Sequence, residues 1–166
     1  MTKLTECNSV NPLVYLSLGT NLGDKQQNLL TAIEKIETQV GHVVAQSAFY
    51  ATQPWGFESD NGFLNACLAV KTRLTPRQLL RVTQRIERAM GRTKKSDGTY
   101  HDRIIDIDIL LYDEIIVNQP DLKIPHPLMH QRLFVLQPLA EIAQNVMVPG
   151  SNISVGEMLK TLEAAS

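Results

Sequence analysis

Short runs rich in apolar and β-branched residues predict the strands of this chain, and glycine, proline or polar residues bound each run. The four main strands are expected at residues 13–18, 42–52, 63–73 and 103–112. A further short strand is expected at 115–117. Prolines within 120–127 favour an extended segment there.

Apolar residues spaced three or four apart predict the helices. The first runs to about Val40, and Asp24 is placed to cap its start. The second begins with a capping Thr75 and a first-turn Pro76, and it ends at Gly91. Two more helices are expected at 133–143 and 154–165.

The main elements follow the order strand, helix, strand, strand, helix, strand. This order predicts one α+β domain over residues 1–166 of the ferredoxin-like class, an antiparallel sheet with helices packed on one face, followed by C-terminal additions. Residues 1–11 are polar and are expected to be flexible.

Composition narrows the class of protein. The 166 residues are 43% hydrophobic and carry a net charge of -1, which favours neither a nucleic acid nor an anionic membrane as partner. No apolar run approaches the roughly 20 residues of a membrane helix, and residues 1–6 do not resemble a signal peptide. Cys7 and Cys67 are too few for a disulfide framework or a zinc site, and Cys67 is expected to be buried. We therefore expect a soluble, cytoplasmic monomer.

Two acids, Asp106 and Asp108, lie two residues apart within an apolar run. Because side chains alternate along a strand, both carboxylates should point to one face and Ile107 to the other. Like charges at this spacing repel, and a divalent cation would relieve the repulsion. Mg²⁺ fits best because it takes few carboxylates and completes its shell with water and phosphates. The alternative is a strand end whose acids are simply solvated.

The segment from Gly19 to Lys25 is only superficially similar to a phosphate-binding loop. Three residues separate Gly19 from Gly23, where the loop motif needs four, and Gln26 stands where the motif needs a hydroxyl residue. A plain turn between strand and helix is the better interpretation.

A polar loop at 92–102 precedes the acidic strand and is rich in basic residues. It fits a lid that closes over phosphates, or a solvated run of charges. Arg103 stands three residues before Asp106, so it either pairs with the carboxylates or, with metal on them, binds phosphate.

His126 lies between two prolines in an extended segment, where it either donates to a phosphate oxygen or has a structural role. For other candidates the choice lies between a ligand contact and a core, turn or solvent-facing position: Phe63, Asn65, Gln84, Glu87 and Phe134.

Four motifs together resemble the 6-hydroxymethyl-7,8-dihydropterin pyrophosphokinase family of folate biosynthesis, from about Val14 to about Pro149. They are Leu18-Gly-Thr-Asn-Leu22, Phe63-Leu-Asn-Ala66, Arg103-x-x-Asp106-x-Asp108, and Pro125-His-Pro127 followed by Arg132-x-Phe134. The resemblance implies a ferredoxin-like fold and transfer of the terminal pyrophosphoryl group of ATP to a reduced hydroxymethylpterin, leaving AMP. It also implies two Mg²⁺ ions and ATP as co-substrate.

The resemblance further implies roles for single residues. Asp106 and Asp108 match metal ligands, and Arg92 and Arg103 match catalytic arginines that hold the phosphates. The residues that match ATP contacts are Gln84, Glu87, Lys94, Tyr100, Ile109, His126 and Arg132. Those that match the pterin pocket are Thr52, Pro54, Trp55, Phe63, Asn65 and Phe134.

The lid segment departs from the family pattern. His101-Asp102 stands where a small residue and proline are usual, and Tyr100 is the nearest residue to a frequent tryptophan. Lys94 replaces a frequent arginine, and the loop is one residue longer. These departures leave the metal motif intact and bear on lid closure, phosphate binding and turnover.

The main alternative is a non-enzymatic sensor of small molecules on the same fold, because one fold hosts many functions. A sensor should bind its ligand without Mg²⁺, whereas tight ATP binding by the enzyme should require it. A nucleic-acid-binding module is disfavoured because no strand carries the aromatic and basic signature of RNA-binding sheets. No side chain is assigned as a general base.

Overall fold

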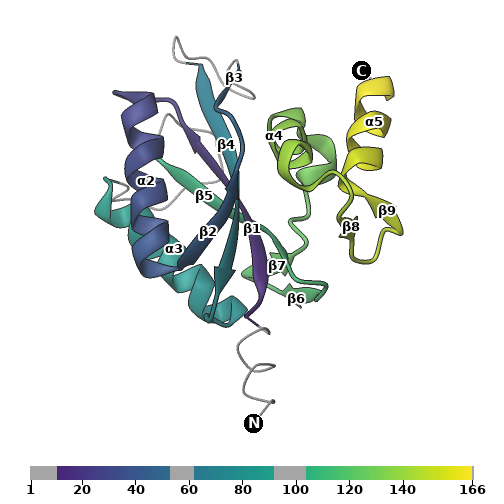
Figure 1. Cartoon of the computed structure of the whole chain (residues 1–166), viewed down its shortest axis with the longest axis horizontal. Coiled ribbons are helices and arrows are strands. Elements are labelled where there is room, and N and C mark those ends of the chain that lie inside the picture. The colour runs from purple at the N-terminus through teal and green to yellow at the C-terminus, as the bar shows by residue number, and fades with distance from the viewer. Residues whose placement is uncertain (1–10, 53–61, 92–103, 166) are drawn as a thin grey trace.

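The computed structural model describes residues 11–52, 62–91 and 104–165. Its centre is an antiparallel sheet in the order β2-β4-β1-β5, with β3 paired to β4 (Figure 1). The strands are β1 (Leu13–Thr20), β2 (Gly41–Gln46), β3 (Tyr50–Thr52), β4 (Phe63–Thr72) and β5 (Asp106–Tyr112). β1 lies between β4 and β5, so the start of the acidic strand is directly beside the end of β1.

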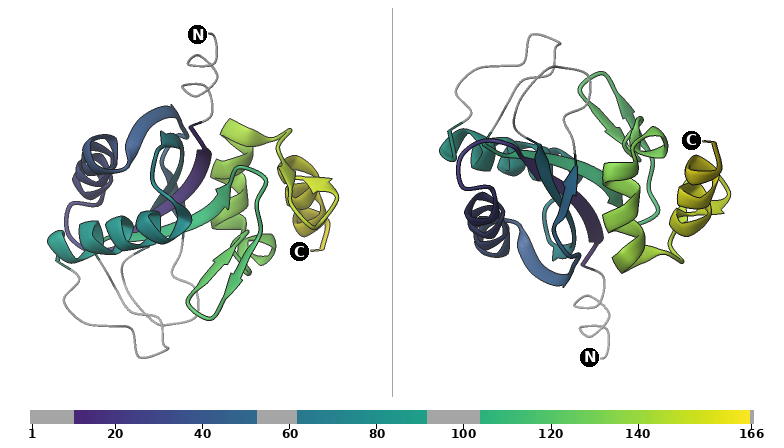
Figure 2. Two further views of the ribbon diagram at one scale, coloured as in Figure 1. Left: turned by 90° about the horizontal axis from the view of Figure 1, so that it is seen from below. Right: turned by 90° about the horizontal axis from the view of Figure 1, so that it is seen from above.

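Helices cover both faces of this sheet. The two helices that alternate with the strands, α2 (Lys25–Gln39) and α3 (Pro76–Ala89), lie on one face as expected. α4 (Leu133–Ala143) covers the other face, and α5 (Val155–Ala165) packs outside α4 (Figure 2). The C-terminal additions therefore form a second helical layer, whose position the sequence had left open. Among the described helices, none is both long and apolar enough to cross a membrane.

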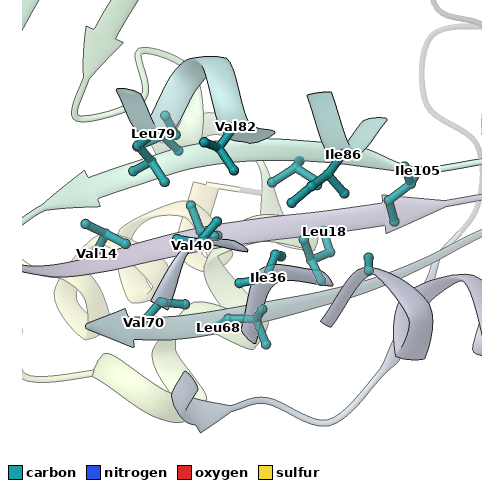
Figure 3. Packing of buried hydrophobic residues seen from close by; sticks show 14 of the residues in the cluster. Val14, Leu18, Ile36, Val40, Leu68, Val70, Leu79, Val82, Ile86 and Ile105 are labelled. Atoms are coloured by element: carbon teal, nitrogen blue, oxygen red, sulfur yellow. The ribbon is translucent and has the colours of Figure 1, made fainter. Parts of the chain in front are cut away.

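The sheet has an apolar core on each face because its central strands are buried on both sides. Alternate residues of β1 divide between the cores: Val14, Leu16 and Leu18 face α2 and α3, whereas Tyr15 faces α4. Figure 3 shows the first core, where Leu79, Val82 and Ile86 of α3 meet Val14 and Leu18 of β1.

A bulge in β5 changes which face its side chains meet. Ile105, Ile107 and Ile109 face α2 and α3, but Leu110 and Leu111 both join the core under α4. The register shifts at the same place, since Leu16 is opposite Ile109 whereas Tyr15 is opposite Leu111. Before the bulge the alternation is regular, so Asp106 and Asp108 share the face that α4 partly covers.

The predicted helix starts are confirmed. Asp24 caps α2 by accepting a hydrogen bond from Gln27 N (3.1 Å). Thr75 and Gln78 form a reciprocal capping box at the start of α3, with Pro76 in the first turn. The two C-terminal helices begin and end within one residue of their expected bounds.

The strand expected at 42–52 is divided in two. Ser47, just after β2, is still bonded to Cys67 of β4: its N–H donates to the carbonyl (3.0 Å), and its Oγ accepts from the Cys67 N–H (2.9 Å). The next amide, of Ala48, donates to the carboxylate of Glu141 on α4 (3.1 Å). The chain rejoins the sheet only at β3.

The prediction of a short strand at 115–117 is wrong in position. Ile115 and Ile116 are 40% and 61% exposed, and the strand β6 (Val117–Gln119) begins after them. It pairs with β7 (Leu122–Ile124), inside the segment expected to be extended. The 3₁₀ turn η1 (Met129–Gln131) and the two-residue strands β8 (Met147–Val148) and β9 (Ile153–Ser154) were not predicted.

Candidate functional site

Asp106 and Asp108 begin β5 beside the end of β1. Both are partly buried, and they lie opposite Gly19 and Ser17 in the ladder. The expected common face is confirmed by the burial of Ile105, Ile107 and Ile109 in the opposite core. Two carboxylates on one face are a donor set suited to Mg²⁺, whose remaining ligands are water and phosphate oxygens. Within the described ranges no group of three or more metal-ligating side chains occurs.

The amide of Asn65 is fixed on β4, and this residue is only 3% exposed. Its Nδ2 donates to Oγ1 of Thr52 on β3 (3.0 Å), and Thr52 lies opposite Phe63. An amide offers both a donor and an acceptor, and its donor is already directed toward Thr52. Of the two alternatives left open for Asn65, the turn position is wrong, because the residue lies within β4.

One row across the sheet joins this amide to the acidic strand. Gly19 is opposite Asn65 on one side and opposite Asp106 on the other. A Cβ at Gly19 would lie 2.9 Å from Asn65 Oδ1 and 3.7 Å from Phe63 Cδ1. The absence of a side chain at Gly19 therefore lets the Asn65 amide lie close over the backbone of β1. Asn65 and Asp106 lie two strand spacings apart, about 10 Å.

His126 follows β7 and is held by backbone bonds on both sides. Its N–H donates to Leu110 O (3.0 Å), and its Nδ1 accepts from Leu128 N (3.1 Å). With Nδ1 as acceptor, the neutral ring carries its proton on Nε2 and can donate there. Burial lowers the pKa of His126 to about 4, with the charge of Arg132 adding to the lowering and that of Asp106 opposing it. His126 is therefore a neutral donor near pH 7.

Arg132 and Phe134 meet at the start of α4. The guanidinium Cζ of Arg132 lies 5.6 Å from the centroid of the Phe134 ring, over its face. Phe134 is partly buried against the core under α4. The guanidinium of Arg132 therefore covers one face of the Phe134 ring, while the same ring also packs against the core.

The two α3 candidates have different environments. Gln84 is exposed, whereas Glu87 is 7% exposed and accepts a hydrogen bond from Ile107 N at 2.7 Å. Glu87 is therefore not a solvent-facing residue. Ile109 is 6% exposed with its side chain in the core, as expected for a residue that would meet a ligand through its backbone.

Several predicted site residues lie outside the described residues. They are Pro54, Trp55, Arg92, Lys94, Tyr100 and Arg103, together with the His101-Asp102 departure.

The sequence interpretation missed residues that position the site. Glu141 of α4 accepts from the hydroxyl of Tyr50 (2.7 Å) as well as from Ala48 N, which fixes the entry to β3. Lys25 Nζ donates to Gly62 O (3.1 Å) and so fixes the residue just before β4. These contacts join residues far apart in the chain, so no local pattern could have indicated them. The turn expected from Gly19 is wrong at its first two residues, because β1 continues to Thr20 and Gly19 therefore lies within the strand.

A separate cavity of about 760 Å³ lies beside His126, between η1 and α5. Side chains such as Met129, Val148 and Met158 line it, and its surface is mostly apolar. A triphosphate needs cations and hydrogen-bond donors, so this cavity does not fit the phosphates of a nucleotide.

Comparison with known proteins supports one family. The family model of 7,8-dihydro-6-hydroxymethylpterin-pyrophosphokinase (HPPK) matches residues 15–144. A Porphyromonas gingivalis protein named 2-amino-4-hydroxy-6-hydroxymethyldihydropteridine pyrophosphokinase is 53% identical over 133 residues, covering 79% of this chain and 90% of that protein. The protein of the same name from Bacillus subtilis is 40% identical over 138 residues, with coverage of 82% and 81%.

Solved structures share the fold. A crystal structure described as HPPK-DHPS in complex with substrates aligns with a TM-score of 0.76 at 16% identity, over 93% of this chain and 44% of that one. Wild-type Plasmodium falciparum HPPK-DHPS with pteroate aligns with a TM-score of 0.74 at 17% identity, over 90% of this chain and 42% of that one. The chain thus spans less than half of these longer proteins. From its sequence relatives, the chain belongs to the 7,8-dihydro-6-hydroxymethylpterin-pyrophosphokinase family, as its motifs predicted.

Proposed function

We propose that this chain transfers pyrophosphate from ATP to 6-hydroxymethyl-7,8-dihydropterin, giving AMP and the pterin diphosphate in folate biosynthesis. The observation that carries the proposal is the row of Asn65, Gly19 and Asp106, in a chain 53% identical to a protein named as this pyrophosphokinase. The hydroxymethyl oxygen bonds to the β-phosphorus of ATP while the bond from that phosphorus to the α-phosphate oxygen breaks. AMP leaves with that oxygen, and the hydroxyl proton passes to solvent.

The metal site of the proposal consists of Asp106 and Asp108. Their carboxylates would hold two Mg²⁺ ions, which supply neutralisation of triphosphate charge and orientation of the phosphates when bound. The protein's own contribution is to keep both carboxylates on one face at the edge of the pterin row. Arg92 and Arg103 are proposed to hold the remaining phosphate charge, as the family resemblance implies.

The pterin pocket of the proposal surrounds Asn65. The amide, directed by Thr52, pairs with the edge of the ring, while Phe63 and Phe134 cover its faces. Pro54 and Trp55 complete the pocket by resemblance. A pterin at Asn65 would direct its hydroxymethyl arm across Gly19 toward the carboxylates.

The ATP site of the proposal lies on the other side of the carboxylates. His126, as a neutral Nε2 donor, binds a phosphate oxygen, and Arg132 adds positive charge. The further ATP contacts carried by resemblance are Gln84, Glu87, Lys94, Tyr100 and Ile109.

Finer aspects of the fold and setting also remain proposals. The antiparallel order β2-β4-β1-β5, with α2 and α3 on one face, supports a ferredoxin-like core. We further propose a cytoplasmic monomer whose partners are ATP and the reduced pterin.

The test is product analysis. Purified protein with ATP, Mg²⁺ and the reduced hydroxymethylpterin should release AMP in step with pterin diphosphate, and omission of Mg²⁺ should stop the reaction. Release of ADP would refute pyrophosphoryl transfer. Calorimetry separates the sensor alternative, because ligand binding that is independent of Mg²⁺, without turnover, would favour a sensor.

A further inference from the structure

A buried carboxylate from α3 holds the backbone between the two candidate metal ligands. Glu87 is 7% exposed, and its Oε2 accepts a hydrogen bond from the N–H of Ile107 at 2.7 Å. Ile107 is the residue that separates Asp106 from Asp108. A charged side chain is rarely buried without a strong partner, because desolvation of the charge is costly. A short bond to a backbone donor provides such a partner.

The hydrogen bond from Ile107 to Glu87 constrains the backbone of a strand at the edge of the sheet. β5 is an edge strand, and within the described residues no other strand pairs with its outer side. Edge strands expose backbone groups and are less constrained than central strands. At Ile107 three constraints coincide: the side chain is buried in the core, the residue is in register with Leu18, and its N–H is held by Glu87.

These constraints pass directly to the two acids. Asp106 and Asp108 are the direct neighbours of Ile107 in the chain. A rotation of the peptide before Ile107 would therefore move Asp106, and a rotation of the peptide after it would move Asp108. Mg²⁺ demands near-ideal octahedral geometry and short metal–oxygen distances. A small loss of backbone order at Ile107 therefore translates into poorer ligand geometry for both carboxylates.

We propose that Glu87 is a positioning residue, which fixes the Ile107 backbone so that Asp106 and Asp108 present their carboxylates in the arrangement that Mg²⁺ requires. The inference rests on the proposed function, since it takes these acids as the metal ligands. The family resemblance implies only that Glu87 contacts the nucleotide. The proposal adds that Glu87 holds the backbone of β5 in place.

Two substitutions of nearly equal size separate this role from a simple effect of charge. Both Glu87→Gln and Glu87→Met remove the carboxyl group, but only glutamine keeps an oxygen that can accept from Ile107 N. Any difference between them therefore reports the hydrogen bond. Glu34→Gln, an exposed glutamate on α2, is the matched control for loss of a carboxylate elsewhere on the protein.

The experiment measures Mg²⁺-dependent binding of a non-hydrolysable ATP analogue by calorimetry, and exchange of the Ile107 amide by NMR. We expect E87M to raise the half-saturating Mg²⁺ concentration by about 10–100-fold, the range for lost supports of metal ligands, and to speed exchange at Ile107. E87Q should fall between the wild type and E87M in both measurements, because it keeps an acceptor for Ile107 N, and E34Q should match the wild type. The rate of AMP release by E87M, relative to the wild type, should be low at low Mg²⁺ and should approach the wild-type rate at saturating Mg²⁺.

Equal Mg²⁺ dependence in E87Q and E87M would overturn the proposal. So would an E87M defect in nucleotide binding that persists unchanged at every Mg²⁺ concentration, because that result identifies a nucleotide contact. If E87M does not fold, Glu87→Asp replaces it: faster Ile107 exchange should then accompany a higher Mg²⁺ requirement, and wild-type values for both would contradict the inference. Failure of the proposed function is distinct, since the wild-type protein itself would then show no Mg²⁺-dependent release of AMP.

Discussion

Substitution of Gly19 by alanine tests the row on which the pterin and metal sites meet. The added Cβ would lie 2.9 Å from Asn65 Oδ1, closer than real Cβ contacts, so the Asn65 amide must move. That amide is buried and bonded to Thr52. Among described atoms outside the neighbouring residues, only those of Asn65 and Phe63 come within 4 Å of this Cβ. The effect should therefore fall on the pterin pocket and leave the carboxylates of β5 in place.

The size of the effect follows from the hydrogen bonds at risk. Displacing Asn65 weakens its bond to Thr52 and its pairing with the pterin edge, at about 1–3 kcal/mol for a buried polar group left poorly paired. Because 1.4 kcal/mol is a factor of ten, the Kd for the pterin should rise by roughly 5–150-fold. Binding of an ATP analogue with Mg²⁺ should change little.

Calorimetry on wild type, Gly19→Ala, Asn65→Ala and the double variant completes the test. The added methyl should cost pterin affinity in the wild-type background and almost none once Asn65 is truncated, because its clash partner is then gone. An equal cost in both backgrounds would show that the methyl acts by another route. Unchanged pterin affinity in Gly19→Ala would refute the reasoning altogether.

Three further outcomes follow from the site. Asp106→Ala and Asp108→Ala should each remove most AMP release while thermal unfolding stays close to that of the wild type, and full activity in either variant would contradict a metal role. The pKa of His126 is lowered to about 4 when folded, so the unfolded chain binds the extra proton first, and stability should fall as pH drops from about 6.5 toward 4. That loss is at most about 3.4 kcal/mol in total, of which about 2 kcal/mol falls between pH 7 and pH 5. Urea unfolding at these two pH values should show a smaller loss in His126→Gln, and an equal loss in both proteins would contradict the prediction. Arg92→Ala should slow turnover more than it weakens pterin binding, and equal effects in steady-state kinetics and calorimetry would argue against a closing role.

The sequence predicted the elements well wherever local pattern decides them. Asp24 and Thr75 give clear capping signals, and the helices that follow depend on nearby residues. The break after β2 was not predictable in the same way, because it depends on Glu141, 93 residues from Ala48 in the chain. Ile115 and Ile116 misled the prediction since they are apolar but exposed, and hydrophobicity alone does not distinguish a buried strand from a surface turn.

In the candidate site, too, the features set by local pattern were predictable and those set by contacts between distant residues were not. Alternation along a strand was enough to place Asp106 and Asp108 on one face. Register is a property of strand pairing, so the alignment of Gly19 with both Asn65 and Asp106 became visible only in the folded sheet. Glu87 illustrates the same limit, because nothing in a helical pattern indicates which backbone amide a glutamate will meet.

The central claim is that Asp106 and Asp108 hold the divalent ions that carry the triphosphate. A crystal structure with Mg²⁺, a non-hydrolysable ATP analogue and the pterin tests it most directly. Metal ions should lie about 2.0–2.1 Å from carboxylate oxygens of both aspartates and bridge to the nucleotide phosphates, with the pterin edge on Asn65. A bound nucleotide whose ions leave both carboxylates without metal would contradict it.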